Sequence, residues 1–265
     1  MTSTTKLLVS DYDKTFFYKT NPEALAENLA AVSQWQQRGN IFAISTGRDA
    51  ASMLYERQNR DVQFDYLVSL NGSLIIDSNN TVIFKQAFSS SLASALVDDI
   101  REEFNDEIII SNGFDGCNFT QREMSQNDPI AREVYQRNLA IYSRSIEQSL
   151  EHEVLLVGCL AKDQQQANAV RSRILDKHKA DVEVFINLNY INIVPKGISK
   201  ASGLERVMQH ANISRSNVTV IGDDYNDIPM LEAFRGFAVP NAKEELIAVA
   251  EDTVESVAAL ISRLS

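Results

Sequence analysis

Two acidic residues, Asp11 and Asp13, stand one residue apart directly after a short apolar run, Leu7 to Ser10. On a tight loop, two carboxylates at this spacing can divide the work of a phosphoryl transfer. One carboxylate can attack phosphorus, while the other donates a proton to the leaving oxygen and later takes one from water. Surface loops and calcium sites also contain Asp-x-Asp, so this pair indicates catalysis only in combination with other residues.

Two further polar segments follow apolar runs elsewhere in the chain. Thr46 and Gly47 offer a hydroxyl and open backbone amides to a phosphate, although Thr46 could instead cap the helix that follows. Lys200 stands at the predicted start of another helix, where the helix dipole adds to its attraction for an anion. Lys196 competes for the same role, and a lysine at this place could also be a solvated surface residue.

The last polar segment is strongly acidic and reads Gly222-Asp223-Asp224-Tyr225-Asn226-Asp227. Together with the first pair, Asp223 and Asp227 would bring four negative charges into one pocket. Each pair of charges about 4 Å apart repels by roughly 4 kcal/mol at an effective dielectric of about 20. A divalent cation reverses that field, and Mg²⁺ suits carboxylates, waters and a phosphate oxygen. The clustering therefore predicts a metal site, with Mg²⁺ as the first choice.

The elements that position these residues alternate between strands and helices in the first part of the chain. Asn21-Pro22 reads as a helix N-cap followed by proline, and Gly39 closes the apolar helical pattern that it begins. This helix separates buried strands at residues 7–10 and 41–44, and a second helix, near 49–60, precedes a strand near 66–70. Such alternation predicts a parallel sheet with right-handed crossovers, in which ligands gather at the carboxyl ends of the strands.

The alternation of strands and helices is interrupted near Asn71 and resumes near Ser199. Between them we predict a hairpin at residues 74–86, helices near 92–104 and 164–178, several short strands, one of them at 117–120, and a polar stretch without a predicted element. The fold class is therefore α/β, with a Rossmann-like parallel-sheet core. Residues 1–82 and 190–265 form this discontinuous core, and residues 83–189 form an inserted α+β domain.

The overall composition excludes several classes of protein. A net charge of −11 disfavours a nucleic-acid partner, which needs clustered basic residues. The two cysteines, Cys117 and Cys159, are too few and too far apart for a zinc site or a redox pair. Since there is no signal-peptide pattern and no apolar run long enough for a membrane, we expect a cytoplasmic protein. The sequence does not determine the oligomeric state.

The four segments together resemble the motifs of the haloacid-dehalogenase superfamily of phosphatases. Asp11-x-Asp13-x-Thr15 is similar to the first motif, Thr46 to the second, Lys200 to the third and Gly222-Asp223-x-x-Asn226-Asp227 to the fourth. Further similarity marks the Cof-like branch (class IIB), whose α/β cap domain lies between the second and third motifs. It rests on Ser45-Thr46-Gly47-Arg48, Asn71-Gly72 and Pro195-Lys196-Gly197-Ile198-Ser199-Lys200.

The resemblance implies a role for each matching residue. Asp11 is the nucleophile and Asp13 the general acid/base. The metal is held by the Asp11 carboxylate, the Asp13 backbone carbonyl and the Asp223 carboxylate, with Asp227 as an outer or supporting ligand. The phosphate is held by Thr46, Gly47 and Lys200, with support from Asn226. One departure is Lys14, where the family usually has glycine, and it puts loop packing and access in question.

The function implied is Mg²⁺-dependent hydrolysis of a small phosphorylated metabolite through an aspartyl phosphate, with a sugar phosphate as the default substrate. A phosphosugar mutase or phosphotransferase of the same superfamily is the first alternative. A phospho-accepting signalling domain is the second, although such domains are about half this length. Three residues stay ambiguous: Arg48 is a substrate contact or a surface ion pair, and Asn71-Gly72 is a hinge, a substrate contact or a simple turn. The segment 112–116 is a turn or a substrate loop.

Overall fold

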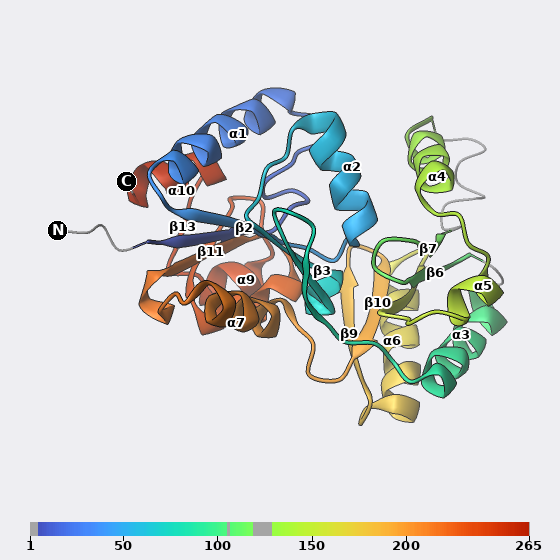
Figure 1. Cartoon of the computed structure of the whole chain (residues 1–265). Helices are drawn as coiled ribbons and strands as arrows, with labels where there is room; N and C mark the ends of the chain where they lie inside the picture. Colours follow the sequence, from blue (N-terminus) through green and yellow to red (C-terminus); the bar gives the residue numbers. More distant parts are fainter. Residues whose placement is uncertain (1–4, 105–106, 119–128, 265) are drawn as a thin grey trace. The chain divides into compact units, whose positions relative to one another are not determined.

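The computed structural model describes residues 5–104, 107–118 and 129–264 of the chain (Figure 1). Its backbone separates into two compact units. We call the first the core unit; it comprises Met1–Arg48, Met53–Phe84 and Ser199–Ser265. We call the second the insert unit; it comprises Asp49–Ser52 and Lys85–Ile198.

The core unit is built on an eight-stranded sheet with the order β13-β12-β11-β1-β2-β3-β4-β5. All neighbours from β13 to β3 pair in parallel, and β4 pairs antiparallel with β3. The strands are β1 (Leu7–Ser10), β2 (Ile41–Ser45), β3 (Tyr66–Ser69), β4 (Leu74–Asp77), β5 (Val82–Lys85), β11 (Val218–Gly222), β12 (Arg235–Ala238) and β13 (Asp252–Thr253). The parallel sheet that the sequence predicts is confirmed.

Helices cover both faces of this sheet, with α1 and α10 on one side and α7 and α9 on the other (Figure 1). They are α1 (Pro22–Gln37), α2 (Ala50–Arg60), α7 (Lys200–Ala211), α8 (Ile228–Ala233), α9 (Glu244–Val249) and α10 (Val257–Leu264), with short 3₁₀ helices η1 (Leu70–Gly72), η3 (Arg215–Asn217) and η4 (Tyr225–Asp227). Because both faces are covered, Leu7, Leu8 and Val9 of β1 are all fully buried.

The first helix shows how local sequence determines these elements. The Asn21 side chain accepts a hydrogen bond from the Ala24 amide (3.0 Å), and proline follows at the first helical position. Val32 and Trp35 form part of the buried face of the helix, and the Trp35 ring nitrogen donates to the Ile41 carbonyl. These contacts fix the turn between α1 and β2.

A glycine allows α7 to approach the sheet closely. A Cβ atom on Gly203 would stand 2.4 Å from the Val68 Cγ1 of β3 and 3.3 Å from the Gly72 Cα. Any side chain at position 203 would therefore push the start of α7 away from β3. This close contact places the first residue of the helix, Lys200, beside the end of the sheet.

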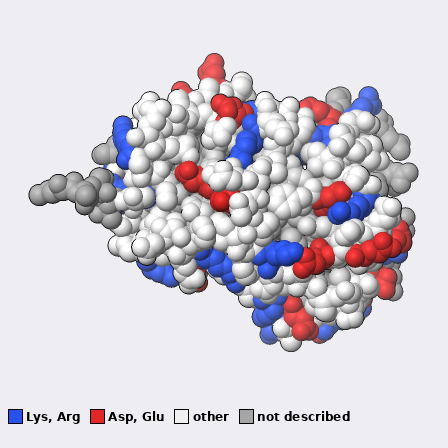
Figure 2. All heavy atoms as spheres, viewed as in Figure 1, with Lys and Arg blue, Asp and Glu red and all other residues white. Residues whose placement is uncertain are grey.

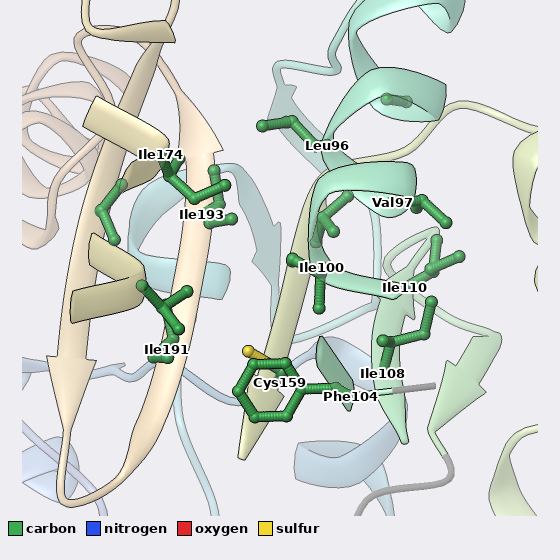
Figure 3. Packing of buried hydrophobic residues seen from close by; sticks show 14 of the residues in the cluster. Leu96, Val97, Ile100, Phe104, Ile108, Ile110, Cys159, Ile174, Ile191 and Ile193 are labelled. Atoms are coloured by element: carbon green, nitrogen blue, oxygen red, sulfur yellow. The ribbon is translucent and has the colours of Figure 1, made fainter. Parts of the chain in front are cut away.

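The insert unit has an antiparallel five-stranded sheet with the order β7-β6-β8-β10-β9. Its strands are β6 (Ile108–Ser111), β7 (Gly116–Asn118), β8 (Leu156–Leu160), β9 (Val182–Asn187) and β10 (Tyr190–Pro195), and its helices are α3 (Ser90–Phe104), α4 (Pro129–Ile141), α5 (Ile146–Leu150) and α6 (Gln164–His178). Apolar side chains of α3 and α6 meet those of the sheet in a dense core (Figure 3). Cys117 and Cys159 are both buried in it as thiols.

Two expectations differ from the structure, and a third falls partly on residues that it does not describe. The boundary of the core, expected at residue 190, lies later, because β10 pairs with β8 and β9 and so belongs to the sheet of the insert unit. Two helices, α4 and α5, occupy part of the stretch for which no element was predicted. The strand expected at residues 117–120 corresponds to β7 (Gly116–Asn118), and residues 119 and 120 lie outside the described residues.

Two observations concern the charged surface and the helices of the described residues. On the face that Figure 2 shows, the basic side chains are interspersed with acidic ones and leave wide uncharged areas between them. A nucleic-acid backbone requires a more clustered basic surface. Among the helices of the described residues, none combines the length and the apolar character that a bilayer-spanning segment requires.

The Gly203 contact gives a testable prediction for stability. Gly203→Ala should lower the free energy of unfolding by about 1–3 kcal/mol, because the added methyl group overpacks the contact with Val68. Urea denaturation followed by circular dichroism measures this change. Gln209→Ala on the exposed side of the same helix is the control and should change stability by less than about 0.5 kcal/mol. Equal stability of Gly203→Ala and wild type would refute the packing argument.

Candidate active site

The site lies in the core unit, at the carboxyl ends of β1, β2 and β11. Ser10, the last residue of β1, is in register with Ile44 of β2 and Ile221 of β11. Asp11 is the next residue, and its amide donates to the Ile221 carbonyl (3.0 Å). The loops that follow the three strands therefore surround Asp11, as expected for the ligand-binding edge of a parallel sheet.

A buried lysine lies between two of the acidic loops. Lys200, with no exposed surface, donates from Nζ to Asp11 Oδ1 at 2.5 Å and to Asp227 Oδ1 at 2.6 Å. The helix that carries it starts with a capping box in which Ser199 and Ser202 exchange hydrogen bonds. Lys196, the competing candidate, is half exposed and pairs with Glu183 in the insert unit. Of the two lysines, Lys200 is thus the one that contacts the acidic loops.

Asp227 organises the acidic loop. Its Oδ2 accepts hydrogen bonds from the backbone amides of Asp223 (3.1 Å) and Asp224 (3.2 Å), while its Oδ1 accepts one from Lys200 Nζ. A Cβ on Gly222 would stand 2.5 Å from the Asp227 carboxyl carbon, so the loop closes over this carboxylate only because residue 222 is glycine. Both Asp227 oxygens are therefore engaged within the protein.

Burial and charge make this group of acids hard to ionise. Burial raises the pKa of Asp11 well above its usual range, Lys200 lowers it, and the charges of Asp227 and Asp223 raise it again. Burial, with the charge of Asp227, raises the pKa of Asp223 to about 7. Burial alone would lower the pKa of Lys200, but the charges of Asp11 and Asp227 outweigh it and raise the pKa. One ammonium group does not fully compensate three neighbouring carboxylates.

Several polar atoms in the site are buried without a partner among the described residues. Asp11 Oδ2, Asn71 Nδ2 and Asn226 Oδ1 make no hydrogen bond there. Leaving such atoms unpaired costs free energy, so a native site with three of them is suited to a bound ligand. Oxygen atoms of Asp11, Asp223 and Asp227 also lie within 4.8 Å of one another, which suits one divalent cation.

Asn71 connects the acidic loop to the loop after β2. Its side-chain oxygen accepts a hydrogen bond from Asn226 Nδ2 (3.1 Å), and its backbone amide donates one to the Thr46 carbonyl (2.9 Å). Its backbone is left-handed (φ 54°), an uncommon conformation that asparagine tolerates better than most residues. Gly72 follows in η1, where a Cβ would stand 2.5 Å from the Ser199 carbonyl oxygen. Both residues hold the site together, and neither is part of a simple exposed turn.

Asp13 lies beside this cluster, and its side chain is 41% exposed. Arg48 grips its carboxylate with two hydrogen bonds, from Nε to Oδ2 (2.8 Å) and from Nη2 to Oδ1 (2.6 Å). Arg48 is thus part of an ion pair, one of the two roles that the sequence left open for it. Lys14, the departure from the family pattern, has a left-handed backbone (φ 64°), which explains why glycine suits this position.

The structure thus brings most of the expected residues together. One group in direct or near contact consists of Asp11, Asp223, Asp227 and Lys200. Asn71 links Thr46 to Asn226, and Gly47 is in the same loop as Thr46. The segment 112–116 is a turn in the insert unit, closed by the Asn112 amide and the Asp115 carbonyl (2.9 Å). Thr15, which the first motif includes without a role, donates to Asp223 (3.2 Å). Glu56, which the sequence did not indicate, contacts Arg48 (2.9 Å). Glu56 and Arg60 carry only the i,i+4 spacing of an ordinary helix surface pair.

Comparison with known proteins identifies the family. Residues 8–259 match the haloacid dehalogenase-like hydrolases. A 5-amino-6-(5-phospho-D-ribitylamino)uracil phosphatase from Bacillus subtilis is 25% identical over 245 residues, which are 90% of this chain and 85% of the relative. A HAD/COF-like hydrolase from Plasmodium vivax has a TM-score of 0.82 at 22% identity, covering 98% of this chain and 95% of that one.

A second solved structure, a sugar phosphatase of HAD subclass IIB, has a TM-score of 0.76 at 20% identity and covers 98% of both chains. These two structures share the fold of this chain, and the family match extends over nearly its whole length. The resemblance that the four motifs indicated is therefore confirmed at the level of the family: this chain belongs to the haloacid dehalogenase-like hydrolases.

Proposed function

We propose that this enzyme is a Mg²⁺-dependent phosphatase that hydrolyses a small phosphorylated metabolite through an aspartyl phosphate on Asp11. The observation that carries the proposal is the state of the Asp11 carboxylate. One of its oxygens is bound by Lys200, and the other is buried with no partner among the described residues. A buried carboxylate held at one oxygen and free at the other is prepared to attack phosphorus.

The residues of the site fit a divalent cation. The Asp11 carboxylate, the Asp223 carboxylate and the Asp13 backbone carbonyl would hold it, since hard oxygen ligands suit Mg²⁺. When bound, Mg²⁺ would neutralise the carboxylates and withdraw charge from the transferring phosphoryl group. Both oxygens of Asp227 already accept hydrogen bonds, so we assign Asp227 to supporting Lys200 and the loop.

The reaction needs two proton transfers at Asp13. As Asp11 bonds to phosphorus and the ester bond breaks, Asp13 donates a proton to the leaving oxygen. In the second step Asp13 takes a proton from a water molecule, whose oxygen attacks phosphorus and displaces the Asp11 carboxylate. Lys200, Thr46 and the Gly47 amide would hold the phosphate oxygens, and Asn226 would support this network. The partial exposure of Asp13 suits a group that must reach both a leaving group and water.

For the substrate class, we propose a phosphorylated sugar or sugar alcohol, and we assign its selection to the insert unit. The relative from Bacillus subtilis is named for a phosphate ester on a ribityl chain, which supports this class. Analysis of products from a panel of sugar phosphates separates hydrolysis from phosphoryl transfer. Free phosphate is the expected product, and an isomerised sugar phosphate would favour the mutase alternative.

The nucleophile can be tested directly. Asp11→Asn should lower kcat for an aryl phosphate by at least about 10³-fold, because an amide cannot form the aspartyl phosphate. The far-UV circular dichroism spectrum should be unchanged. A labelled phospho-enzyme should be trapped in wild type and be absent from this variant. Persistent wild-type turnover in Asp11→Asn would exclude Asp11 as the nucleophile.

The cation should bind in competition with a proton. Below about pH 7 Asp223, whose pKa is raised to about 7, carries a proton that a cation must displace. The apparent affinity for Mg²⁺ should therefore rise by at least roughly tenfold per pH unit up to about pH 7, because Asp11, whose pKa is also raised, can bind a second competing proton. Calorimetric titration of EDTA-treated protein at several pH values measures this, and Mg²⁺ should restore activity. A pH-independent affinity between pH 5.5 and 7 is the contrary result.

Lys200 should also be needed for stability before a cation binds. Lys200→Met should destabilise the EDTA-treated protein by about 3–5 kcal/mol at pH 8, because it leaves buried carboxylates without their counter-charge. Denaturant unfolding gives this value. Lys196→Met is the matched control, since its partly exposed pair with Glu183 should contribute less than about 1 kcal/mol. Comparable losses in the two variants would argue against the assigned charge balance.

A further inference from the structure

A buried carboxylate outside the family motifs contacts the residue that holds Asp13. Glu56, on α2 of the core unit, has a side chain that is only 1% exposed. Its Oε1 accepts Arg48 Nη1 at 2.9 Å. Its Oε2 accepts Arg60 Nη1 at 2.5 Å and the Tyr12 hydroxyl at 3.1 Å. Buried glutamates are rare unless they are paired, and this one has three donors from three places in the sequence.

These contacts leave Arg48 little freedom to turn. Two of its nitrogens bind the Asp13 carboxylate, and the third binds Glu56. Its guanidinium carbon also lies 4.8 Å from the centroid of the Tyr12 ring. A planar guanidinium that is fixed at one end presents a fixed two-pronged site at the other, and this geometry is specific for one carboxylate orientation.

The charges along this chain of contacts also balance. Once Asp13 has given up its proton, Asp13 and Glu56 are the two anions, and Arg48 and Arg60 are the two cations. Burial alone would lower the pKa of Arg48, but the charges of Asp13 and Glu56 raise it, so the guanidinium stays charged. Tyr12, within the first motif, is fully buried and uses its hydroxyl only to hold Glu56 in the contacts described.

We propose that Glu56 is a positioning residue for proton transfer: it fixes Arg48, and Arg48 in turn fixes the orientation of the Asp13 carboxylate. Without this anchor, the partly exposed Asp13 side chain would sample orientations that do not reach the leaving oxygen. The inference rests on the proposed role of Asp13 as general acid/base. Arg60 and Tyr12 are the supports that keep Glu56 in place.

The test uses the dependence of the rate on the leaving group. A poor leaving group, such as the alkoxide of ethyl phosphate, needs a proton from Asp13, whereas the dinitrophenolate of 2,4-dinitrophenyl phosphate leaves without one. The ratio of kcat/KM for these two substrates reports the first chemical step. Glu56→Gln should lower kcat/KM for ethyl phosphate by about tenfold or more, and for the dinitrophenyl ester by less than about twofold.

Matched variants separate this effect from simple structural damage. Glu205→Gln, which loses an exposed pair with Arg215, should leave both rates unchanged. Tyr12→Phe removes only the hydroxyl contact with Glu56 and should shift the ratio in the same direction, by about two- to threefold. It carries the test if Glu56→Gln does not fold. The apparent affinity for Mg²⁺ should stay the same in all three variants.

The variant Asp13→Asn separates a failure of the role proposed for Asp13 from a failure of the role proposed for Glu56. If it does not lower the ethyl phosphate rate selectively, the role proposed for Asp13 fails, and the role of Glu56 fails with it. If Asp13→Asn is selective but Glu56→Gln and Tyr12→Phe slow both substrates equally or leave both unchanged, only the positioning role of Glu56 is overturned. A faster ethyl phosphate reaction in Glu56→Gln would also overturn it, because Arg48 would then be restraining Asp13.

Discussion

The buried contact of Lys200 with Asp11 and Asp227 is the interaction on which the rest of the site depends. It joins the end of β1, the start of α7 and the loop after β11, which are far apart in the sequence. Taking one ammonium and two carboxylates out of water is costly, and such a group persists only where additional hydrogen bonds satisfy it. The amides that Asp227 accepts and the close approach of α7 at Gly203 provide those conditions.

The same contact explains why the proposed cation would stabilise the site. Lys200 neutralises only part of the charge of Asp11, Asp223 and Asp227, and an oxygen of Asp11 lacks a partner among the described residues. The protein alone therefore leaves part of the negative charge of this cluster uncompensated. Lys200 and a cation would share the work of charge compensation, so that an anionic phosphate can enter a protein whose net charge is −11.

The sequence predicted well where local chemistry and burial agree. The strand at Leu7 to Ser10 and the helix after Asn21-Pro22 were predictable because caps, proline and apolar periodicity all indicate one structure. The helix α5 was missed although Ser145 and Gln148 form a capping box, a signal that the sequence contains. The strand at Tyr190 to Pro195 was assigned to the wrong unit, because an apolar run does not specify its pairing partners.

The motif residues of the site could be predicted from the sequence, but the contacts that hold them in place could not. Asp11, Asp223 and Lys200 stand at strand or helix ends, where topology alone brings them together. The roles of Asn71 and Glu56 depend on tertiary contacts that the sequence does not display. Asn71 has a left-handed backbone and links two loops, and Glu56 is buried in contact with Arg48 and Tyr12. Nothing in a helix surface pair such as Glu56 and Arg60 indicates that the glutamate is buried.

The interrupted path of the chain has a consequence for the order of folding. β1 is synthesised first, but its partner β11 follows the whole insert unit, as the pairing of Leu7 with Val218 shows. The strands of the insert unit come from one stretch of the chain and can pair while β11 is still on the ribosome. Closing the long connection between β1 and β11 carries the larger entropic cost. Asp11, after β1, and Asp223, after β11, can therefore come together only once the whole insert unit has been synthesised.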